Sequence, residues 1–408
     1  MTTIKDSVHD HIEVTGVAAE LLDTPAVQRL RHVRQLGTAT LVYPSANHTR
    51  FEHSLGVYHL ADAALGHLGI EGQQAERVRA AALLHDVGHS PYSHNLEAVI
   101  HRYTGKYHDD VAELIGSGPV ARVLSEHGIN PDAVAALIAG EGQLGQVVSG
   151  ELDVDRMDYL VRDAHHTGVP YGTIDHERLV RELRFVDGEL VLDEGNVQTA
   201  ESLLLARALM NPTVYNHHVA RIAKSMLRRG VERLLGTADV TPAELRRMDD
   251  HDVLVALRAS EATTDIADRL SHRRLYKRAV WAEMDAVPED LLDAGHEEIR
   301  SHERTIAEEA SVDPRRVIID VPGRPTMRES SSRVLVNGEA RRLGDQSTLV
   351  KALRTAQRDQ WRLGVYAPED VSERVGNAAI RTLGLDLEDT LVRDTRPGIH
   401  ATLDEFET

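Results

Sequence analysis

The segment Leu84–His94 concentrates side chains that can bind a metal ion or transfer a proton. It reads Leu-His-Asp-Val-Gly-His-Ser-Pro-Tyr-Ser-His, so His85 and Asp86 are adjacent and are followed by His89 and His94. An isolated histidine is usually structural, but a cluster of this kind is less easily explained in that way. Imidazole and carboxylate groups without thiolate suit divalent metals. The segment therefore predicts part of a coordination sphere whose other ligands lie elsewhere.

Two distant segments contain the best candidates for the remaining ligands. His53 lies upstream in Asn47–Gly56, and Asp155 lies downstream in Leu152–Tyr159, each on a predicted helix of its own. The sequence contains no cysteine, which excludes disulfides, thiolate ligands and cysteine nucleophiles. Histidine and aspartate accept several divalent metals, so the sequence predicts a metal without selecting one.

One histidine, then His-Asp, then a distant aspartate on separate helices is the motif order of the HD superfamily, which this chain resembles. The motifs look most like those of the deoxynucleoside triphosphate (dNTP) triphosphohydrolases, relatives of the human SAM-and-HD-domain enzyme, without its SAM domain. The resemblance extends from Asp6 to about His218 and, more weakly, through Ser330–Pro368. It implies four metal ligands: His53, His85, Asp86 and Asp155.

The resemblance also implies which residues act on the phosphate. His89, His94 and His108 match the family's catalytic and phosphate-contacting histidines, and Glu97 stands where a supporting aspartate is usual. The expected metal is one divalent transition ion, Mn, Fe, Zn, Ni or Co, and Mg can arrive with the nucleotide. It would polarise a phosphate oxygen and activate a water at the α-phosphorus, while His94 or His108 passes a proton to the leaving 5′-oxygen. The expected products are deoxynucleoside and inorganic triphosphate.

Helical spacing supports a nucleoside pocket beside these groups. Arg207, Asn211 and Tyr215 would share one helix face, although Pro212 should kink that helix. Residues at intervals of four, four and three share a face of another helix: Asp155, Tyr159, Asp163 and His166.

The family resemblance assigns roles within this pocket. Gln35, Asp163 and Tyr215 would surround the sugar, with the aspartate accepting from a 3′-hydroxyl and the tyrosine excluding a 2′-hydroxyl. Arg50 and Arg156 match residues that contact the triphosphate, although lysine is common at the second position. An ordinary interior role for either pocket tyrosine fits the sequence equally well. The predicted substrate-binding residues are Gln35, Arg50, Arg156, Tyr159, Asp163, Arg207 and Tyr215.

A possible regulatory segment begins at Asp23-Thr24-Pro25. Asp23, Gln28 and Arg31 match positions that, in some relatives, hold an activating guanine nucleotide at a subunit interface. The preceding Asp6–Asp10 reads Asp-Ser-Val-His-Asp where the family has Asp-Pro-Val-His-Gly, which changes the backbone freedom. A helix N-cap followed by a surface arginine stripe is an equally good interpretation.

Apolar residues at intervals of three and four predict that the first part of the chain is an α-helical bundle. A β-hairpin is expected at Arg184–Asp193, turning at Asp187-Gly188. The predicted helices are Leu21–Leu36, Ser54–Leu68, Gln74–His85, Asn95–Tyr103, Asp109–Ile115, Asp132–Ala139, Asp155–His166 and Val197–Leu209.

The composition changes after Leu235, where Gly236–Pro242 predicts a break before helices that continue to Ala310. The last third contains signals of one small sheet and a helix against it: strands Arg316–Val321 and Arg333–Val336, a turn at Asn337-Gly338, and a helix Thr348–Trp361. We therefore expect a mainly α protein, with an HD-type helical catalytic domain at 1–235 and a smaller α+β lobe at 236–408 packed on it.

The charge balance bears on partners and location. The 65 acidic and 46 basic residues give a formal net charge of −19, which disfavours binding to nucleic acid and anionic lipid. The acids are spread along the chain, as on a surface adapted to a salty cytoplasm. No apolar run approaches the roughly 20 residues of a membrane span. We expect a cytoplasmic protein with a nucleotide substrate and, from the resemblance, a homodimer or homotetramer.

Two other functions stay open at the level of sequence. One is an HD phosphohydrolase for another nucleotide or phosphate ester, because this kind of metal site serves many substrates. The other is a nucleotide-binding sensor without turnover. His89, His94 and His108 favour an enzyme, because a sensor has no evident need for a proton shuttle.

Overall fold

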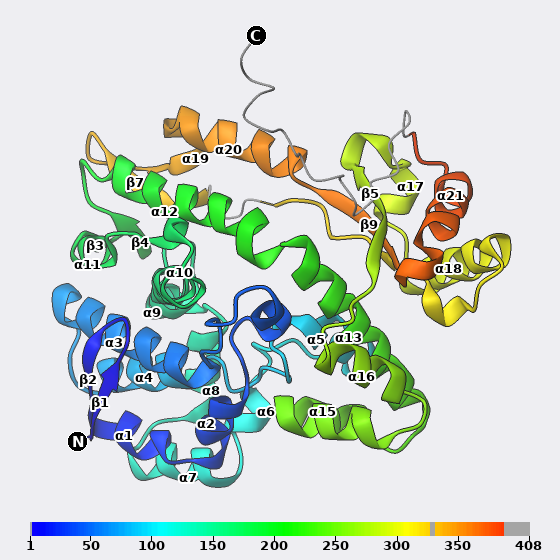
Figure 1. Ribbon diagram of the computed structural model, residues 1–408. Helices are drawn as coiled ribbons and strands as arrows, with labels where there is room; N and C mark the ends of the chain where they lie inside the picture. The colour runs from blue at the N-terminus through cyan, green and yellow to red at the C-terminus, as the bar shows by residue number, and fades with distance from the viewer. Residues whose placement is uncertain (1, 327–330, 387–408) are drawn as a thin grey trace, which may run out of the picture. The chain divides into compact units, whose positions relative to one another are not determined.

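The computed structural model describes residues 2–326 and 331–386 (Figure 1). Helices dominate this part of the chain, and its strands form three small sheets. The predicted mainly α fold with a smaller mixed region toward the C-terminus is therefore confirmed. Two compact units are present: residues 2–271 with 331–354 form the first, and residues 272–326 with 355–386 form the second.

The first unit is a helical bundle with a large hydrophobic core and a second, smaller one where α5 packs with α13, α15 and α16. Its central helices α3 and α4 pack along each other, α10 packs on α3, and α1 and α8 pack on α4. The helices are α1 Gly16–Leu22, α2 Pro25–Arg29, α3 Arg50–Leu68, α4 Gly72–Leu84, α5 His94–Thr104, α6 Ala112–Ile115, α7 Gly118–Glu126, α8 Pro131–Ile138, α9 Gly142–Val148, α10 Val154–Thr167, α11 His176–Arg181, α12 Val197–Met210, α13 His218–Gly236, α14 Pro242–Arg247, α15 Asp250–Ala259, α16 Thr264–Ser271 and α19 Leu343–Gln346. Helix α20, Thr348–Asp359, crosses the division between the units.

Local signals fix the ends of the two helices that position most of the site. Thr49 and Glu52 form a capping box at the start of α3, where the Thr49 backbone N–H donates to Glu52 Oε2 at 2.6 Å. The Asp153 carboxylate caps α10 by accepting from the Arg156 N–H at 2.8 Å. Both helices end at a glycine with a left-handed backbone.

Two sheets belong to the first unit. Strands β1 (Thr2–Asp6) and β2 (Asp10–Val14) form an antiparallel hairpin. The other sheet has the order β3-β4-β7-β8, in which β4 and β7 pair in parallel. Its strands are β3 Leu183–Val186, β4 Glu189–Leu192, β7 Arg333–Val336 and β8 Glu339–Arg342. The predicted hairpin at Arg184–Asp193 is thus confirmed, and a distant second hairpin extends it.

The second unit has its own hydrophobic core. An antiparallel sheet of order β5-β9-β6 carries helices α18 and α21, which pack against each other. Its elements are β5 Lys277–Glu283, α17 Glu289–Leu292, α18 His296–Ala310, β6 Ile318–Asp320, β9 Arg362–Ala367 and α21 Ser372–Leu383.

Several predicted elements need correction. The expected helix Leu21–Leu36 is broken, because Pro25 restricts the residue before it and starts a new short helix. The two predicted C-terminal strands belong to different sheets, β6 in the second unit and β7 in the first. The helix expected from Asp109 begins only at Ala112. Strands β1, β2, β5, β8 and β9 were not predicted.

The contacts divide the chain after Ser271, and residues 331–354 return to the first unit. The predicted boundary after Leu235 coincides instead with the end of α13 at Gly236. The division into a catalytic domain at 1–235 and a lobe at 236–408 packed on it stays a prediction. Within the described residues, no helix is long and apolar enough to cross a membrane.

Candidate active site

The four predicted metal ligands lie together between helices α3, α4 and α10. Ligand atoms of His53, His85 and Asp86 are all within 4.8 Å of one another. The fourth, Asp155, places Oδ1 at 2.9 Å from His53 Nε2 and at 3.9 Å from His85 Nε2. His85 and Asp86 follow the last residue of α4, so the end of one helix projects them toward the other two.

The donor atoms of this group fit a divalent cation. His85 Nδ1 donates to the Ala82 carbonyl at 2.8 Å, which leaves Nε2 buried and, among the described residues, without a hydrogen-bond partner. Burial lowers the pKa of His53, but hydrogen bonds to Asp155 and Asp158 outweigh it and raise the pKa to about 10. A pocket that stabilises positive charge and holds a buried imidazole nitrogen 3.3 Å from the Asp86 carboxylate has the character of a metal site.

Neighbouring side chains hold the ligands in place. His53 Nδ1 donates to Asp158 Oδ2 at 2.8 Å, so its other nitrogen faces the group. Arg50 Nη1 donates to both oxygens of Asp86, at 2.9 and 3.1 Å. Burial raises the pKa of Asp86, but the Arg50 charge and the nearby histidines hold it well below its usual range. Asp86 is therefore held as a carboxylate.

A second group of titratable side chains adjoins the first. Ring nitrogens of His89, His94 and His108 lie within 4.8 Å of one another, and His89 Nε2 is 3.2 Å from Asp86 Oδ1. Glu97 accepts from His94 Nδ1 at 2.9 Å and from His108 Nδ1 through a short hydrogen bond. One carboxylate thus fixes two imidazoles with their Nε2 atoms available.

The charges of this group differ from one residue to the next. Burial raises the pKa of Glu97, but its bonds to His108 and His94 outweigh this and hold the pKa far below normal. Burial lowers the pKa of His108, yet the Glu97 bond more than offsets it and the pKa is raised. For His94, desolvation on its protein-facing side, together with the charges of Arg50 and His108, outweighs the Glu97 bond and lowers the pKa. Different pKa shifts in adjacent groups are a common feature of acid–base sites.

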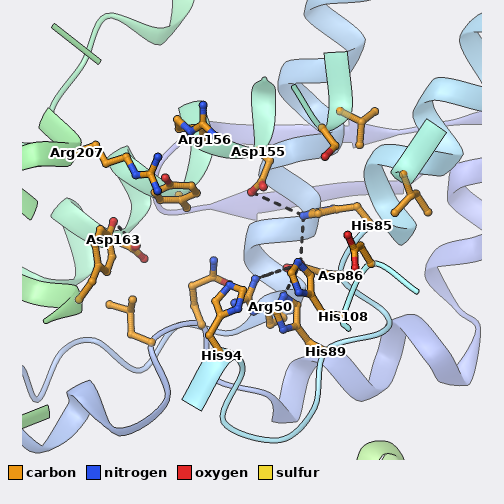
Figure 2. Close-up of a pocket in the computed structure, with 18 of the residues that line it drawn as sticks. Arg50, His85, Asp86, His89, His94, His108, Asp155, Arg156, Asp163 and Arg207 are labelled. Carbon is orange, nitrogen blue, oxygen red and sulfur yellow. Dashed lines mark hydrogen bonds and ion pairs between the residues drawn. The ribbon is translucent and has the colours of Figure 1, made fainter. Parts of the chain in front are cut away.

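Both groups open into a cavity of about 430 Å³, within the range of small-molecule sites. Figure 2 shows the histidines and Asp86 on one side of it and Arg156, Arg207 and Asp163 on the other, with Arg50 between. The lining residues are Gln35, Leu36, Arg50, His85, Asp86, His89, His94, His108, Asp109, Ile138, Val148, Ser149, Asp155, Arg156, Tyr159, Asp163, Arg207, Asn211 and Tyr215. Every predicted substrate-binding residue is among them.

The end of the cavity remote from the histidine cluster is organised around Asp163, which is 1% exposed. Tyr215 donates its hydroxyl to Asp163 Oδ2 at 2.9 Å, and His48 Nε2 donates to Oδ1 at 2.8 Å. The Tyr159 and Tyr215 rings meet edge to face at 6.2 Å. Gln35 is buried, and its Oε1 has no hydrogen-bond partner in the described part of the chain.

Pro212 changes the type of helix, but Arg207, Asn211 and Tyr215 still share one face. Helix α12 ends at Met210, and residues Asn211–Tyr215 form a π-helical turn closed by the Asn216 N–H and the Asn211 carbonyl at 2.7 Å. The wider turn keeps Arg207, Asn211 and Tyr215 on the cavity. The expected kink is therefore a local π-turn.

Of the three predicted regulatory residues, Asp23 directly follows α1, Gln28 lies on α2, and Arg31 lies on the short 3-10 helix after it, Leu30–His32. They are not among the described residues that line the cavity. Gln28 Nε2 donates to the Leu22 carbonyl at 2.8 Å, and Arg31 Nε donates to Gln28 Oε1 at 2.8 Å. Asp23 is exposed. Nucleotide binding by these residues stays a prediction.

The sequence did not single out several residues that hold the site together. His48 supports Asp163, and Asp158 supports His53. Asp250, at the start of α15, accepts from the Tyr92 N–H at 2.6 Å and from the Arg34 N–H at 3.2 Å. Tyr92 and Ser93 have positive φ. The two hydrogen bonds to Asp250 therefore stabilise the strained turn that leads to His94. Only Asp158 had a local signal, its four-residue spacing from Arg162.

Comparisons of sequence agree with this geometry. A family model described as the HD domain matches residues 50–163, and one described as the HD associated region matches residues 174–394. An uncharacterized protein of Methanocaldococcus jannaschii is 32% identical, covering 96% of this chain and 86% of its own length. An uncharacterized protein of Bacillus subtilis is 31% identical, covering 90% and 92%. The human deoxynucleoside triphosphate triphosphohydrolase SAMHD1 is 29% identical over 68% of this chain and 51% of its own length.

Two solved structures are similar to this chain over nearly all of its length. A hypothetical protein from Aquifex aeolicus has a TM-score of 0.75 and 27% identity, covering 92% of this chain and 99% of that one. A phosphohydrolase from Bacteroides thetaiotaomicron has a TM-score of 0.72 and 25% identity, covering 90% and 100%. The chain therefore belongs to the HD-domain phosphohydrolases, with an HD associated region after the HD domain and dNTP triphosphohydrolases among its relatives.

Proposed function

We propose that this protein hydrolyses deoxynucleoside triphosphates to deoxynucleoside and inorganic triphosphate. The observation that carries the proposal is a cavity that joins the two histidine–carboxylate groups to three arginines and to the Tyr159, Asp163 and Tyr215 cluster. These three parts suit a reactive phosphate, a polyphosphate chain and a sugar. The human relative's name states the same reaction.

The metal chemistry would rest on His53, His85, Asp86 and Asp155 as ligands. A divalent cation at this position supplies Lewis-acid polarisation of a phosphate oxygen and an activated water. Arg50 keeps Asp86 ionised and faces the same cavity. It can therefore act both on a ligand and on the substrate's charge.

Binding of the triphosphate is proposed to fall to Arg50, Arg156 and Arg207. All three line the cavity, whereas the chain as a whole carries a net charge of −19. A local cluster of guanidinium groups offsets this general repulsion, and its planar donors match phosphate oxygens. Preorganised positive groups also stabilise charge that develops in the transition state.

Proton transfer is proposed to use the Glu97-centred pair. His94 and His108 each direct Nδ1–H to Glu97, so their Nε2 atoms can exchange a proton with the leaving 5′-oxygen. The raised pKa of His108 favours the protonated form that a general acid requires. His89, stacked on His108 with ring centroids 4.3 Å apart, would contact the phosphate.

Recognition of the sugar is proposed to centre on Asp163. Its two oxygens each accept one bond from the protein, from His48 and Tyr215, so lone pairs remain for a 3′-hydroxyl. The Tyr215 ring beside it would leave no room for a 2′-hydroxyl. Gln35 offers its unpaired Oε1 to the same ligand.

The test is to measure triphosphate, pyrophosphate and orthophosphate release from the four dNTPs, ATP and GTP, with Mn, Mg, Fe or Co added. Triphosphate release from dNTPs alone, abolished in Asp86→Ala, is the expected result. Pyrophosphate or orthophosphate release would indicate an HD phosphohydrolase of another specificity. Nucleotide binding without turnover under every metal would indicate a sensor.

A further inference from the structure

The turn of the N-terminal hairpin, Asp6–Asp10, reaches the inner side of helix α10. Asp6 shapes this turn, because its Oδ1 accepts from the backbone N–H groups of Val8 at 2.9 Å and His9 at 2.8 Å. Asp10 has a φ of 64°, a left-handed backbone. The side chains of Asp6 and His9 are consequently directed inward, with exposed fractions of 4% and 2%.

A closed network of charged hydrogen bonds links this turn to α10. Arg162 Nη1 donates to Asp6 Oδ2 at 2.8 Å, and Arg162 Nε donates to Asp158 Oδ2 at 2.8 Å. His9 Nε2 lies 2.6 Å from Asp158 Oδ1. Arg162 and Asp158 are fully buried. Charged groups so deep in a protein are retained only when each is well paired, and here each is.

The same network ends at a metal ligand. Asp158 Oδ2 also accepts from His53 Nδ1 at 2.8 Å, and His53 Nε2 faces Asp155 and Asp86. His9 and His53 therefore bind opposite oxygens of one carboxylate. A hydrogen bond to the remote nitrogen of a ligating histidine fixes its tautomer and ring orientation, and the groups that set this bond tune metal affinity.

Helix α10 has two functional faces. Asp155, Tyr159 and Asp163 face the cavity, whereas Asp158 and Arg162 face the hairpin turn. The prediction that His166 shares the face of Asp155, Tyr159 and Asp163 is wrong, because His166 follows Arg162 by one helical turn and lies on this second side. Its Nε2 is 3.2 Å from Ser7 Oγ, and its ring stacks on His48 at 4.4 Å. The turn thus touches α10 behind both the metal ligands and Asp163.

Helix α3 is built to leave room for this network. A Cβ at Gly56 would lie 1.8 Å from Asp158 Oδ1 and 2.5 Å from Arg162 Nη2. Glycine at this position lets the two helices approach closely enough for His53, three residues earlier, to reach Asp158.

We propose that the hairpin turn is a positioning element of the metal centre: His9 and the Asp6–Arg162 pair hold Asp158, and Asp158 orients His53. The turn lies outside both matched family regions, 50–163 and 174–394. His9 is a positioning residue, because it acts on the metal through Asp158 and His53.

The test compares two substitutions at His9 with the same two at His11, an exposed histidine of the same hairpin. His9→Phe keeps a ring against the neighbouring His59 and His176 rings but removes the donor to Asp158. His9→Gln keeps an N–H donor of similar reach. Metal affinity is measured by titrating Mn²⁺ or Co²⁺ against a competing chelator, with bound metal checked by elemental analysis.

We expect His9→Phe to bind metal about 10- to 100-fold more weakly, as for other residues that support metal-bound histidines. His9→Gln should recover most of that affinity, and both His11 variants should match the unsubstituted protein. If His9→Phe folds and binds metal as tightly as the unsubstituted protein, the proposal is overturned. An equal loss of metal affinity in both His9 variants would also overturn it. Failure of both His9 variants to fold would assign the turn to general stability and overturn it as well.

This inference is independent of the substrate, because the affinity measurement needs no nucleotide. One further outcome does rest on the proposed function: with metal in excess, His9→Phe should regain kcat and keep its KM for dNTP. If the unsubstituted protein does not hydrolyse dNTPs, the proposed function is contradicted. The comparison of metal affinities would still test the role of the hairpin turn.

Discussion

Single residues decide the chemistry of this site through their immediate partners. Glu97 shows this most clearly, because one carboxylate accepts from both His94 and His108. It raises the pKa of His108, whereas desolvation and the charges of Arg50 and His108 still lower the pKa of His94. Asp163 similarly gathers His48 and Tyr215 at the other end of the cavity. Substitutions that keep the size of these side chains and change only their charge are the sharpest tests.

Glu97→Gln should shift the alkaline limb of the kcat profile to lower pH. The carboxylate raises the pKa of His108 against burial and the Arg50 charge, and Asp86, His89 and His94 complete its surroundings. Without that charge the pKa falls, so a general acid loses its proton at lower pH. We expect kcat to fall about 10²- to 10⁴-fold, as when acid catalysis is lost.

The pH profile of kcat and an NMR titration of His108 measure this change. Glu126→Gln, an exposed glutamate on α7, is the matched control and should leave both unchanged. An alkaline limb that does not move in Glu97→Gln would contradict the role of His108.

Asp163→Asn should raise the KM for dNTPs with a smaller effect on kcat. A hydrogen bond to a charged group contributes about 1.5–3 kcal/mol, which corresponds to roughly a 10- to 150-fold change in binding. Metal content is the internal control, because Asp163 is not among the proposed ligands. An unchanged KM for dNTPs would remove Asp163 from sugar recognition.

At the scale of elements, close approach of α3 and α10 builds the site. Arg50 is the first residue of α3 and His53 is the fourth, whereas Asp155 and Asp158 lie on α10. Apolar spacing predicted both helices, but it placed the start of α3 at Ser54 and so missed the first turn, which carries Arg50 and His53. The start of α10 was predicted to within one residue. The separation of the two helices was not predictable, because it depends on one glycine and on buried ion pairs.

Gly56→Ala and Gly66→Ala form a matched pair in α3. The Cβ added at Gly56 would overlap Asp158 and Arg162, whereas nothing lies within 4 Å of one added at Gly66. We expect Gly56→Ala to lower the free energy of unfolding by about 1–3 kcal/mol and to weaken metal binding. Gly66→Ala should raise it by about 0.5–1 kcal/mol, because alanine favours helix.

Denaturant unfolding and metal titration of the two variants measure the difference. A Gly56→Ala protein as stable as Gly66→Ala, with the metal affinity of the unsubstituted protein, would show that the helices have room to separate.

At the scale of the whole molecule, we expect the excess of acidic residues to affect stability. The net charge of −19 sets up self-repulsion that the three arginines of the cavity relieve only locally. Assembly adds a second whole-molecule property: we expect a homodimer or homotetramer, which light scattering measures.

Salt should stabilise the protein. Raising KCl from about 0.1 to 1 M shortens the Debye length from about 10 to 3 Å and weakens repulsion among surface acids, so the Tm should rise by several degrees. Replacing the exposed Glu126, Glu261 and Glu298 by Gln should reduce that gain. A Tm that falls or stays constant with KCl would contradict adaptation to a salty cytoplasm.

The sequence by itself determined the parts of the molecule that depend on neighbours along the chain. Most helices follow from apolar spacing, and the hairpin at Arg184–Asp193 follows from alternation around Asp-Gly. The His85–Asp86 pair and its partners followed from residue type and motif order, although their gathering at one point became visible only in the fold.

Only the tertiary structure decided the contacts between distant segments. His9 and Asp158 are 149 positions apart, His48 and Asp163 are 115 apart, and β7 pairs with β4 from more than a hundred residues away. Such contacts have no period along the chain. They form because buried charges must find partners and strand edges must find hydrogen bonds, and the packing of the bundle selects which ones meet.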